Sequence, residues 1–272
     1  MLSNPGLPHQ AIPRMFNPPA SSPPPAWFQT PAGRYIADWS LETADALLLD
    51  VFGLQAAQVG CEALDFLANN RAQHRFRCGI AQPDARTLPG NTPFVLSTDA
   101  AALPFDGDSL DLLVLPYVLE FHPHPHQVLR EAQRVLRPEG RLLVLGFNPL
   151  SLWGLRNSLS QARMPGKVAF PWPGHYLAIH RLKDWLKLLD FEVARGRFGC
   201  YAPPCRSERT LANMKWLEFA GDRWWGFAGA CYAVMAVKRI AGMTLITPNW
   251  LGKEQKLAPK ASLVTEQQSQ KS

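Results

Sequence analysis

The chain has 272 residues, 47% of them apolar, and its 28 Lys and Arg against 22 Asp and Glu give a formal net charge of +6. This length suits one decorated α/β domain with a sizeable core. The charge permits a polyanionic partner without requiring one, because the charged residues form no long run. Five cysteines without a CxxC pair argue against a disulfide scaffold and a zinc ribbon.

Targeting signals are not evident in the sequence. No charged segment followed by an apolar one comes after Met1, so we expect no secretory signal. The most apolar stretch, Trp224 to Val237, has about 14 residues, which is short of the roughly 20 that a membrane helix needs. We therefore expect a cytoplasmic protein without a transmembrane segment.

The two ends of the chain differ in composition from its middle. Residues 1–33 hold nine of the 25 prolines and almost no charge, which predicts a disordered or polyproline-like arm. The last residues, from about Lys253, are polar and lack periodicity. We therefore expect one domain over residues 34–240, between a Pro-rich arm (1–33) and a loosely ordered tail (241–272).

Short apolar runs alternate with helical patterns along the middle of the chain. Near-continuous apolar strands separated by amphipathic helices are typical of a parallel sheet covered on both faces. The predicted fold is a three-layer, doubly wound α/β sheet. Strands are predicted over residues 56–60, 75–80, 94–97, 110–115, 141–147, 191–198 and 230–238, and helices over 40–52, 62–69, 128–136 and 182–189.

Ligands of an open parallel sheet bind outside the carboxyl ends of its strands, so the residues that follow each predicted strand are candidates for a site. They are Gly60, Cys61 and Glu62 after the first strand, Thr98, Asp99 and Ala100 after the third, Pro116, Tyr117 and Val118 after the fourth, and Asn148 and Pro149 after the fifth.

Several short runs in fixed order resemble a known family. They begin at Asp99 (Asp-Ala-Ala-Ala-Leu-Pro-Phe), Asp108 (Asp-Ser-Leu-Asp), Tyr117 (Tyr-Val-Leu-Glu) and Arg134 (Arg-Val-Leu-Arg-Pro). Together they resemble the core of class I S-adenosylmethionine-dependent methyltransferases of the small-molecule "type 11" group. The resemblance is continuous over about 94–148 and weaker over 36–93 and 180–239. It implies a Rossmann-like sheet of seven strands, with the last one antiparallel.

The resemblance also implies a function and a cofactor site. The function is methyl transfer from S-adenosylmethionine to an unidentified acceptor, expected to be a small molecule. Asp99 would accept a hydrogen bond from the adenine amino group, and the Ala100 backbone would meet the ring. Pro116 and Tyr117 would line the cofactor and the transfer axis.

The segment after the first strand departs from the family pattern. The usual signature is an acidic residue followed by three glycines at alternate positions, which let the backbone approach the cofactor. Between Gln58 and Asp65 only Gly60, followed by Cys61, is kept. Gln82 or Asp84 would take the place of the acid that grips the ribose. The alternative to an enzyme is therefore a methyltransferase-like binding protein that has lost catalysis.

No catalytic base can be chosen from the sequence. Methyl transfer needs a base only where the acceptor carries a proton of high pKa. The candidates are Tyr117, His122, Asn148, His175 and His180.

Two further interpretations were weighed against simpler ones. We expect the run of His122, His124 and His126 to be exposed loop residues and no metal to bind. A nucleic-acid methylase would rest on the +6 charge and the Asn148-Pro149 pair, but that pair follows the fifth strand, so we interpret it as a turn.

The second half of the chain is rich in aromatic residues. A lid built from them would favour an apolar or planar acceptor. The pair Trp224-Trp225 would suit a membrane interface, but the sequence pattern indicates no basic amphipathic helix to accompany it.

Overall fold

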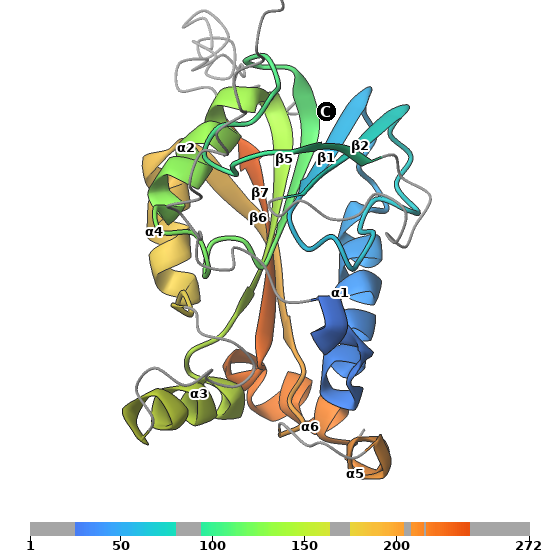
Figure 1. Cartoon of the computed structure of the whole chain (residues 1–272), viewed down its shortest axis with the longest axis vertical. Coiled ribbons are helices and arrows are strands. Elements are labelled where there is room, and N and C mark those ends of the chain that lie inside the picture. Colours follow the sequence, from blue (N-terminus) through green and yellow to red (C-terminus); the bar gives the residue numbers. More distant parts are fainter. Residues whose placement is uncertain (1–24, 80–93, 164–174, 204–207, 215, 240–272) are drawn as a thin grey trace, which may run out of the picture. The chain divides into compact units, whose positions relative to one another are not determined.

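The structure is a computed structural model that describes residues 25–79, 94–163, 175–203, 208–214 and 216–239 (Figure 1). The ribose-acid candidates Gln82 and Asp84 lie outside these residues, as do most of the predicted arm and the whole predicted tail.

A single seven-stranded sheet forms the centre of the described residues, in the order β3-β2-β1-β4-β5-β7-β6. The first five strands are parallel, and β7 pairs antiparallel with both β5 and β6. The predicted doubly wound fold, with its antiparallel last strand, is confirmed. The strands are β1 (Gln55–Val59), β2 (His74–Gly79), β3 (Phe94–Ser97), β4 (Leu110–Pro116), β5 (Leu136–Phe147), β6 (Phe191–Gly199) and β7 (Cys231–Lys238).

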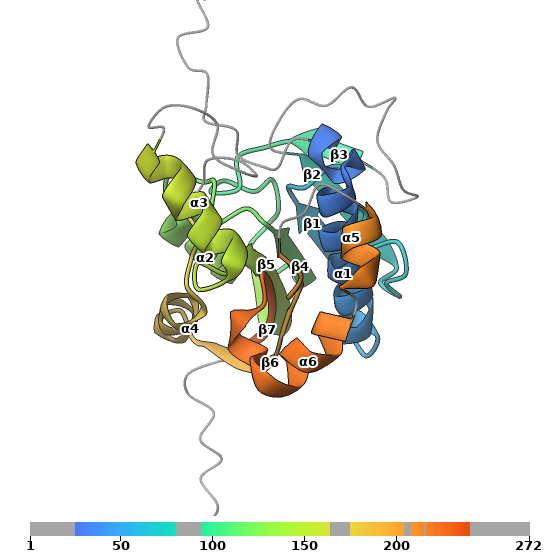
Figure 2. The ribbon, with the colours of Figure 1, turned by 90° about the horizontal axis from the view of Figure 1, so that it is seen from below.

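Helices cover both faces of the sheet, which explains why its strands are apolar on both sides. One face packs on α1 and the other on α2 and α4, as Figures 1 and 2 both show. The helices are η1 (Pro25–Gln29), α1 (Pro31–Leu48), α2 (Pro125–Val135), α3 (Leu152–Arg163), α4 (Ile179–Leu188), α5 (Glu208–Asn213), α6 (Trp216–Trp224) and η2 (Gly226–Ala228).

The first helix begins earlier than its periodicity predicts. Thr30 caps α1, since its hydroxyl accepts a 3.1 Å hydrogen bond from the Gly33 N–H, and Pro31 fits the first helical turn. Residues 25–33, which composition placed in the arm, thus form η1 and the start of α1, and Phe28 is buried among them. Ser40, where the predicted helix over 40–52 begins, lies inside α1, and its hydroxyl donates to the Ile36 carbonyl.

Two other predicted boundaries differ from the structure. Residues 62–69 form turns rather than a helix, because side chains of the protein bind the backbone groups of this segment. Strand β5 begins at Leu136, so residues 137–140, which separate the predicted helix over 128–136 from the predicted strand over 141–147, lie inside a strand. Glu139 there has a φ of 62°, a conformation that marks an irregular strand start.

Candidate functional site

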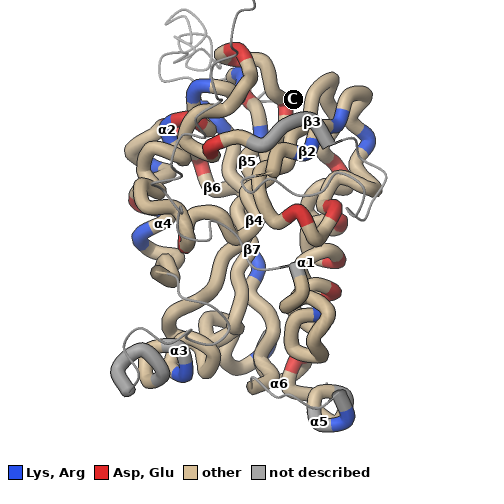
Figure 3. The backbone as a smooth tube through the Cα atoms, in the orientation of Figure 1, with Lys and Arg blue, Asp and Glu red and all other residues tan. Residues whose placement is uncertain are grey.

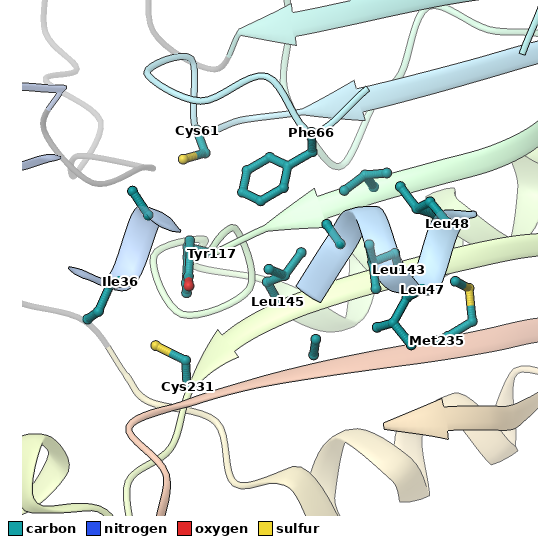
Figure 4. Close-up of a cluster of buried hydrophobic side chains, with 14 of the residues drawn as sticks. Ile36, Leu47, Leu48, Cys61, Phe66, Tyr117, Leu143, Leu145, Cys231 and Met235 are labelled. Carbon is teal, nitrogen blue, oxygen red and sulfur yellow. The ribbon is translucent and has the colours of Figure 1, made fainter. Parts of the chain in front are cut away.

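The carboxyl edge, where strands β1 to β5 end, has unusual backbone geometry at two neighbouring strands. Gly60 and Cys61 after β1 have φ angles of 80° and 49°, and Tyr117 after β4 has a φ of 56°. A left-handed conformation costs a non-glycine residue on the order of 1–3 kcal/mol, and such residues gather at ligand sites. In Figure 4, Cys61 and Tyr117 lie in one buried cluster with Cys231 from β7.

Asp99 ends the edge strand β3 with an open carboxylate. Its Oδ1 accepts a 2.9 Å hydrogen bond from the Ala101 N–H and lies 2.9 Å from Nε2 of His122. These two contacts, the backbone one first, hold the pKa of Asp99 below its usual value. The side chain is 62% exposed, and within the described residues no hydrogen bond reaches its Oδ2. At neutral pH the edge therefore presents an anionic acceptor.

The loop after β1 is held by the side chain of Gln58, which is buried. Its amide nitrogen donates to the carbonyls of Gly60 (3.1 Å), Cys61 (3.3 Å) and Leu64 (2.8 Å). Its amide oxygen accepts from the Phe66 N–H at 2.9 Å. One residue thus satisfies four backbone groups that a helix would otherwise have paired.

A second buried side chain braces the same loop from β2. The guanidinium of Arg77 donates to the carbonyl of Glu62 at 2.6 Å and lies 3.8 Å from the carboxylate of Asp65. The loop therefore takes its shape from Gln58 and Arg77, at positions where the family pattern would rely on glycine backbone.

Glu120 is a buried carboxyl that the sequence reasoning assigned no role. It lies three residues beyond Tyr117, and its Oε1 accepts a 2.7 Å hydrogen bond from the Phe147 N–H. Burial raises the pKa of Glu120 to about 7. One signal was present in the sequence, since Glu120 is the single charged residue in the apolar stretch from Leu112 to Phe121.

Two tyrosines share the surroundings of Glu120. Oε2 of Glu120 and the hydroxyls of Tyr176 and Tyr232 are buried and lack a hydrogen-bond partner within the described residues. A Cβ on Gly146 would lie 2.4 Å from Oε1 of Glu120 and 2.5 Å from the Tyr232 hydroxyl, so these oxygens are neighbours that pack against the backbone where only glycine fits. This arrangement can hold a proton on Glu120.

The six predicted cofactor residues fall into two classes. Asp99 is exposed, whereas Gly60, Cys61, Ala100, Pro116 and Tyr117 are buried. Strands β2 and β1 separate β3 from β4, so a ligand that reached from Asp99 to Tyr117 would span about 14 Å, three strand spacings. The predicted set therefore extends across three strand spacings, and Asp99 is its exposed member.

Tyr117 is packed in the core rather than open to a ligand. Its hydroxyl lies 2.6 Å from the Ser40 hydroxyl of α1, and its ring stacks on Phe147 with centroids 4.6 Å apart. Burial raises its pKa well above the usual value. Tyr117 is thus a poor proton acceptor at neutral pH.

The remaining base candidates are occupied or exposed. Asn148 donates to the carbonyls of Phe227 (2.7 Å) and Gly229 (2.9 Å) and accepts from the Leu150 N–H, which agrees with its interpretation as a turn residue. The side chains of His175 and His180 are exposed.

The loop histidines do not behave alike. His124 and His126 are exposed as predicted, and the ring of His126 lies against that of Trp185. The prediction is wrong for His122, whose side chain is 7% exposed because it contacts Asp99.

None of the helices that the structure describes is both long and apolar enough to cross a membrane.

Sequence comparisons agree with this geometry. A family model described as "Methyltransferase domain" (Methyltransf_11) matches residues 61–144. The uncharacterised YafS protein of Escherichia coli is 30% identical over 178 residues, which are 62% of this chain and 66% of YafS. The ubiquinone/menaquinone biosynthesis C-methyltransferase UbiE of Roseobacter denitrificans is 32% identical over 123 residues, 42% of this chain and 47% of UbiE. The chain thus spans between about half and two thirds of these relatives.

Solved structures share the fold. A methyltransferase from Thermotoga maritima covers 79% of this chain and 93% of its own, with a TM-score of 0.56 and 17% identity. A methyltransferase from Mesorhizobium loti covers 74% of this chain and 97% of its own, with a TM-score of 0.51 and 17% identity. Strand order and structural likeness agree on the class I methyltransferase fold, and residues 61–144 match the type 11 methyltransferase domain family.

Proposed function

We propose that this protein binds S-adenosylmethionine at the carboxyl edge of its sheet and transfers the methyl group to a small-molecule acceptor. The observation that carries the proposal is Asp99, an exposed anion with an oxygen that no described residue uses. It ends the third strand, where the family resemblance expects the residue that accepts the adenine amino group.

The residues at the adenine end suit this cofactor. A carboxylate is the right partner for an exocyclic amine, because the amine is a donor and an ionised carboxylate only accepts. The contact of His122 with Oδ1 positions the carboxylate and leaves Oδ2 for a ligand. When bound, the cofactor supplies an activated methyl group on a good leaving group. The protein then has to orient the acceptor and exclude water.

Glu120 would serve acceptors that lose a proton on methylation. A proton acceptor works best when its pKa is close to the working pH, and Glu120 meets that condition through its burial beyond β4. The proton would be held at Oε2, beside the hydroxyls of Tyr176 and Tyr232. Glu120 therefore replaces Tyr117 and the loop histidines as our candidate base.

The names of two relatives guide the choice of acceptor. UbiE is named for ubiquinone and menaquinone biosynthesis, and a mouse relative that is 43% identical over 53 residues is named a polyprenyl-benzoquinol methylase. These matches cover part of each chain, so a benzoquinol is one member of the acceptor set to test.

One observation favours a second function, that of a binding protein without catalysis. The loop after β1 is closed by Gln58, and Glu62 and Leu64 occupy positions where the family pattern has glycines. Such a loop would hold the methionine end of the cofactor differently from the usual enzymes.

A methyl-transfer assay separates the two functions. The protein would be incubated with methyl-labelled S-adenosylmethionine and a panel of phenols, benzoquinols and amines, and S-adenosylhomocysteine would be quantified. Acceptor-dependent product that Glu120→Gln reduces for proton-losing acceptors supports the enzyme and its base. Cofactor binding without product from any acceptor supports the binding protein.

A further inference from the structure

Large apolar side chains are exposed together beyond the carboxyl edge. Three lie on α3, three on α6 and three in the segments beside them. This set, the apolar collar, consists of Leu150 (71% exposed), Leu152 (56%), Leu155 (55%), Leu159 (49%), Trp216 (62%), Phe219 (82%), Trp224 (72%), Trp225 (54%) and Phe227 (67%).

Helix α3 has two faces of opposite burial. Leu152, Leu155 and Leu159 repeat at a spacing of three and four, so they form one stripe along the helix. Trp153 is buried on another side, where its indole N–H donates to the Ala202 carbonyl at 2.8 Å. The helix is therefore anchored through Trp153 while its leucine stripe faces solvent.

Hydrogen bonds connect the α3 side of the collar to the α6 side. The amide of Asn148 donates to the carbonyls of Phe227 and Gly229, and its oxygen accepts from the Leu150 N–H. Figures 1 and 2 both place α3 and α6 at the end of the domain into which β5 runs. The two sides of the collar are thus joined at Asn148 and lie at the same end of the domain.

Among the side chains that the structure describes, the exposed charges around the collar are cationic. Arg156 on α3, Arg209 on α5 and Arg223 on α6 are exposed, and Figure 3 shows basic segments on α3 and α5. Between Glu139 and Asp184 the sequence contains no Asp or Glu. Glu218 of α6 is turned inward, where it accepts from the N–H of Tyr201 at 3.0 Å and from the Tyr35 hydroxyl.

We propose that the apolar collar docks this protein on an anionic phospholipid bilayer. An exposed apolar helix stripe with tryptophans and flanking arginines has the composition of a membrane-surface segment, in which the apolar side chains enter the headgroup boundary and the arginines meet phosphates. The leucine stripe of α3 with Arg156 supplies the basic amphipathic helix that the sequence pattern did not reveal. If the proposed function also holds, docking would bring the cofactor edge to an acceptor dissolved in the bilayer.

Vesicle flotation tests the proposal with the full chain, independently of methyl transfer. Vesicles of phosphatidylcholine alone would be compared with vesicles of phosphatidylcholine and phosphatidylglycerol. We expect binding to the anionic vesicles that falls with added salt. Phe219→Ser and Leu155→Ser should each lower the partition coefficient about tenfold, the loss expected for one buried apolar side chain. Arg223→Glu should weaken binding to the anionic vesicles alone.

Leu188→Ser is the matched control. Leu188 is 81% exposed on α4, outside the collar, so its replacement should leave vesicle binding unchanged. An unchanged melting temperature would show that each surface variant is folded. Absence of flotation with both vesicles, or an equal loss with Leu188→Ser, would overturn the proposal. So would a dimer in sedimentation that Phe219→Ser dissociates, since the collar would then join two copies of the chain.

Discussion

Asp99 and Glu120 follow strands of the same sheet edge, yet the protein shifts the pKa values of their carboxyl groups in opposite directions. Asp99 is exposed, and hydrogen bonds from Ala101 and His122 lower its pKa. Glu120 is buried, and the loss of water raises its pKa to about 7. Two acids separated by environment in this way can divide recognition and proton transfer between them.

The difference has a structural origin in the turns that carry the two residues. The turn after β3 leaves the carboxylate at the outer edge of the sheet, where only one of its oxygens is used. The turn after β4 lies between central strands, and Glu120 is enclosed by Phe147 of β5 and Tyr232 of β7. Position across the sheet thus decides whether hydrogen bonds lower the pKa of an acid or burial raises it.

The largest predicted effect concerns Glu120 and pH. Its pKa in the folded state exceeds its ordinary value of 4.5, so folding favours the protonated form. As pH rises from about 4.5 to about 7, the unfolded chain ionises first and the folded state loses about 3 kcal/mol of relative stability. Glu120→Gln removes this loss. Urea unfolding of both proteins should show that the free energy of unfolding of the variant rises relative to that of the wild type between about pH 5 and pH 8.

Replacing Asp99 by Asn in the same experiment provides the control. The pKa of Asp99 is lowered, so its contribution to stability is lost as pH falls, the opposite direction. If the free energies of unfolding of the wild type and Glu120→Gln change in parallel with pH, Glu120 does not have a raised pKa, and that part of the comparison is refuted.

The next effect concerns the loop that lies between the two acids. Gln58→Ala leaves three carbonyls and one N–H of the loop without their partner, so we expect a loss of about 2–3 kcal/mol in the free energy of unfolding. Gln55→Ala is the matched control on the same strand, since no hydrogen bond of the Gln55 side chain occurs among the described residues. Equal melting temperatures for the two variants would show that Gln58 does not hold the loop.

The smallest effect concerns cofactor affinity at Asp99, the exposed acid after β3. Asp99→Ala removes one exposed acceptor, so we expect S-adenosylmethionine affinity to fall by about 1 kcal/mol, roughly fivefold. Asp106→Ala, which removes an exposed carboxylate a few residues farther on, should bind as the wild type does. Calorimetry on the three proteins checks this, and equal dissociation constants would remove Asp99 from the adenine site.

The strands of the fold could be predicted from the sequence because they are apolar on both faces. Runs such as Leu110 to Leu115 are bounded by turn residues, and they are apolar because they are buried between two helix layers. The turns at residues 62–69 could not be predicted, since their shape depends on hydrogen bonds from Gln58, a side chain outside the segment.

The site divides in the same way. Asp99 could be identified because a local motif surrounds it, and the structure leaves it exposed at a strand end. Glu120 could not, because its protonation depends on burial between β5 and β7, which are distant in sequence. The collar was hidden for a related reason. In the sequence, the apolar stripe of α3 has the pattern of a core-facing stripe. The structure shows that Trp153 occupies the buried side instead.

The central claim is that this edge binds S-adenosylmethionine despite its altered glycine loop. Calorimetric titration of the full-length protein with S-adenosylmethionine and S-adenosylhomocysteine tests it most directly. We predict saturable binding of both compounds in the micromolar range, with one site per chain. No detectable heat or saturation with either compound would contradict the claim and identify the loop closed by Gln58 as the place where the cofactor site was lost.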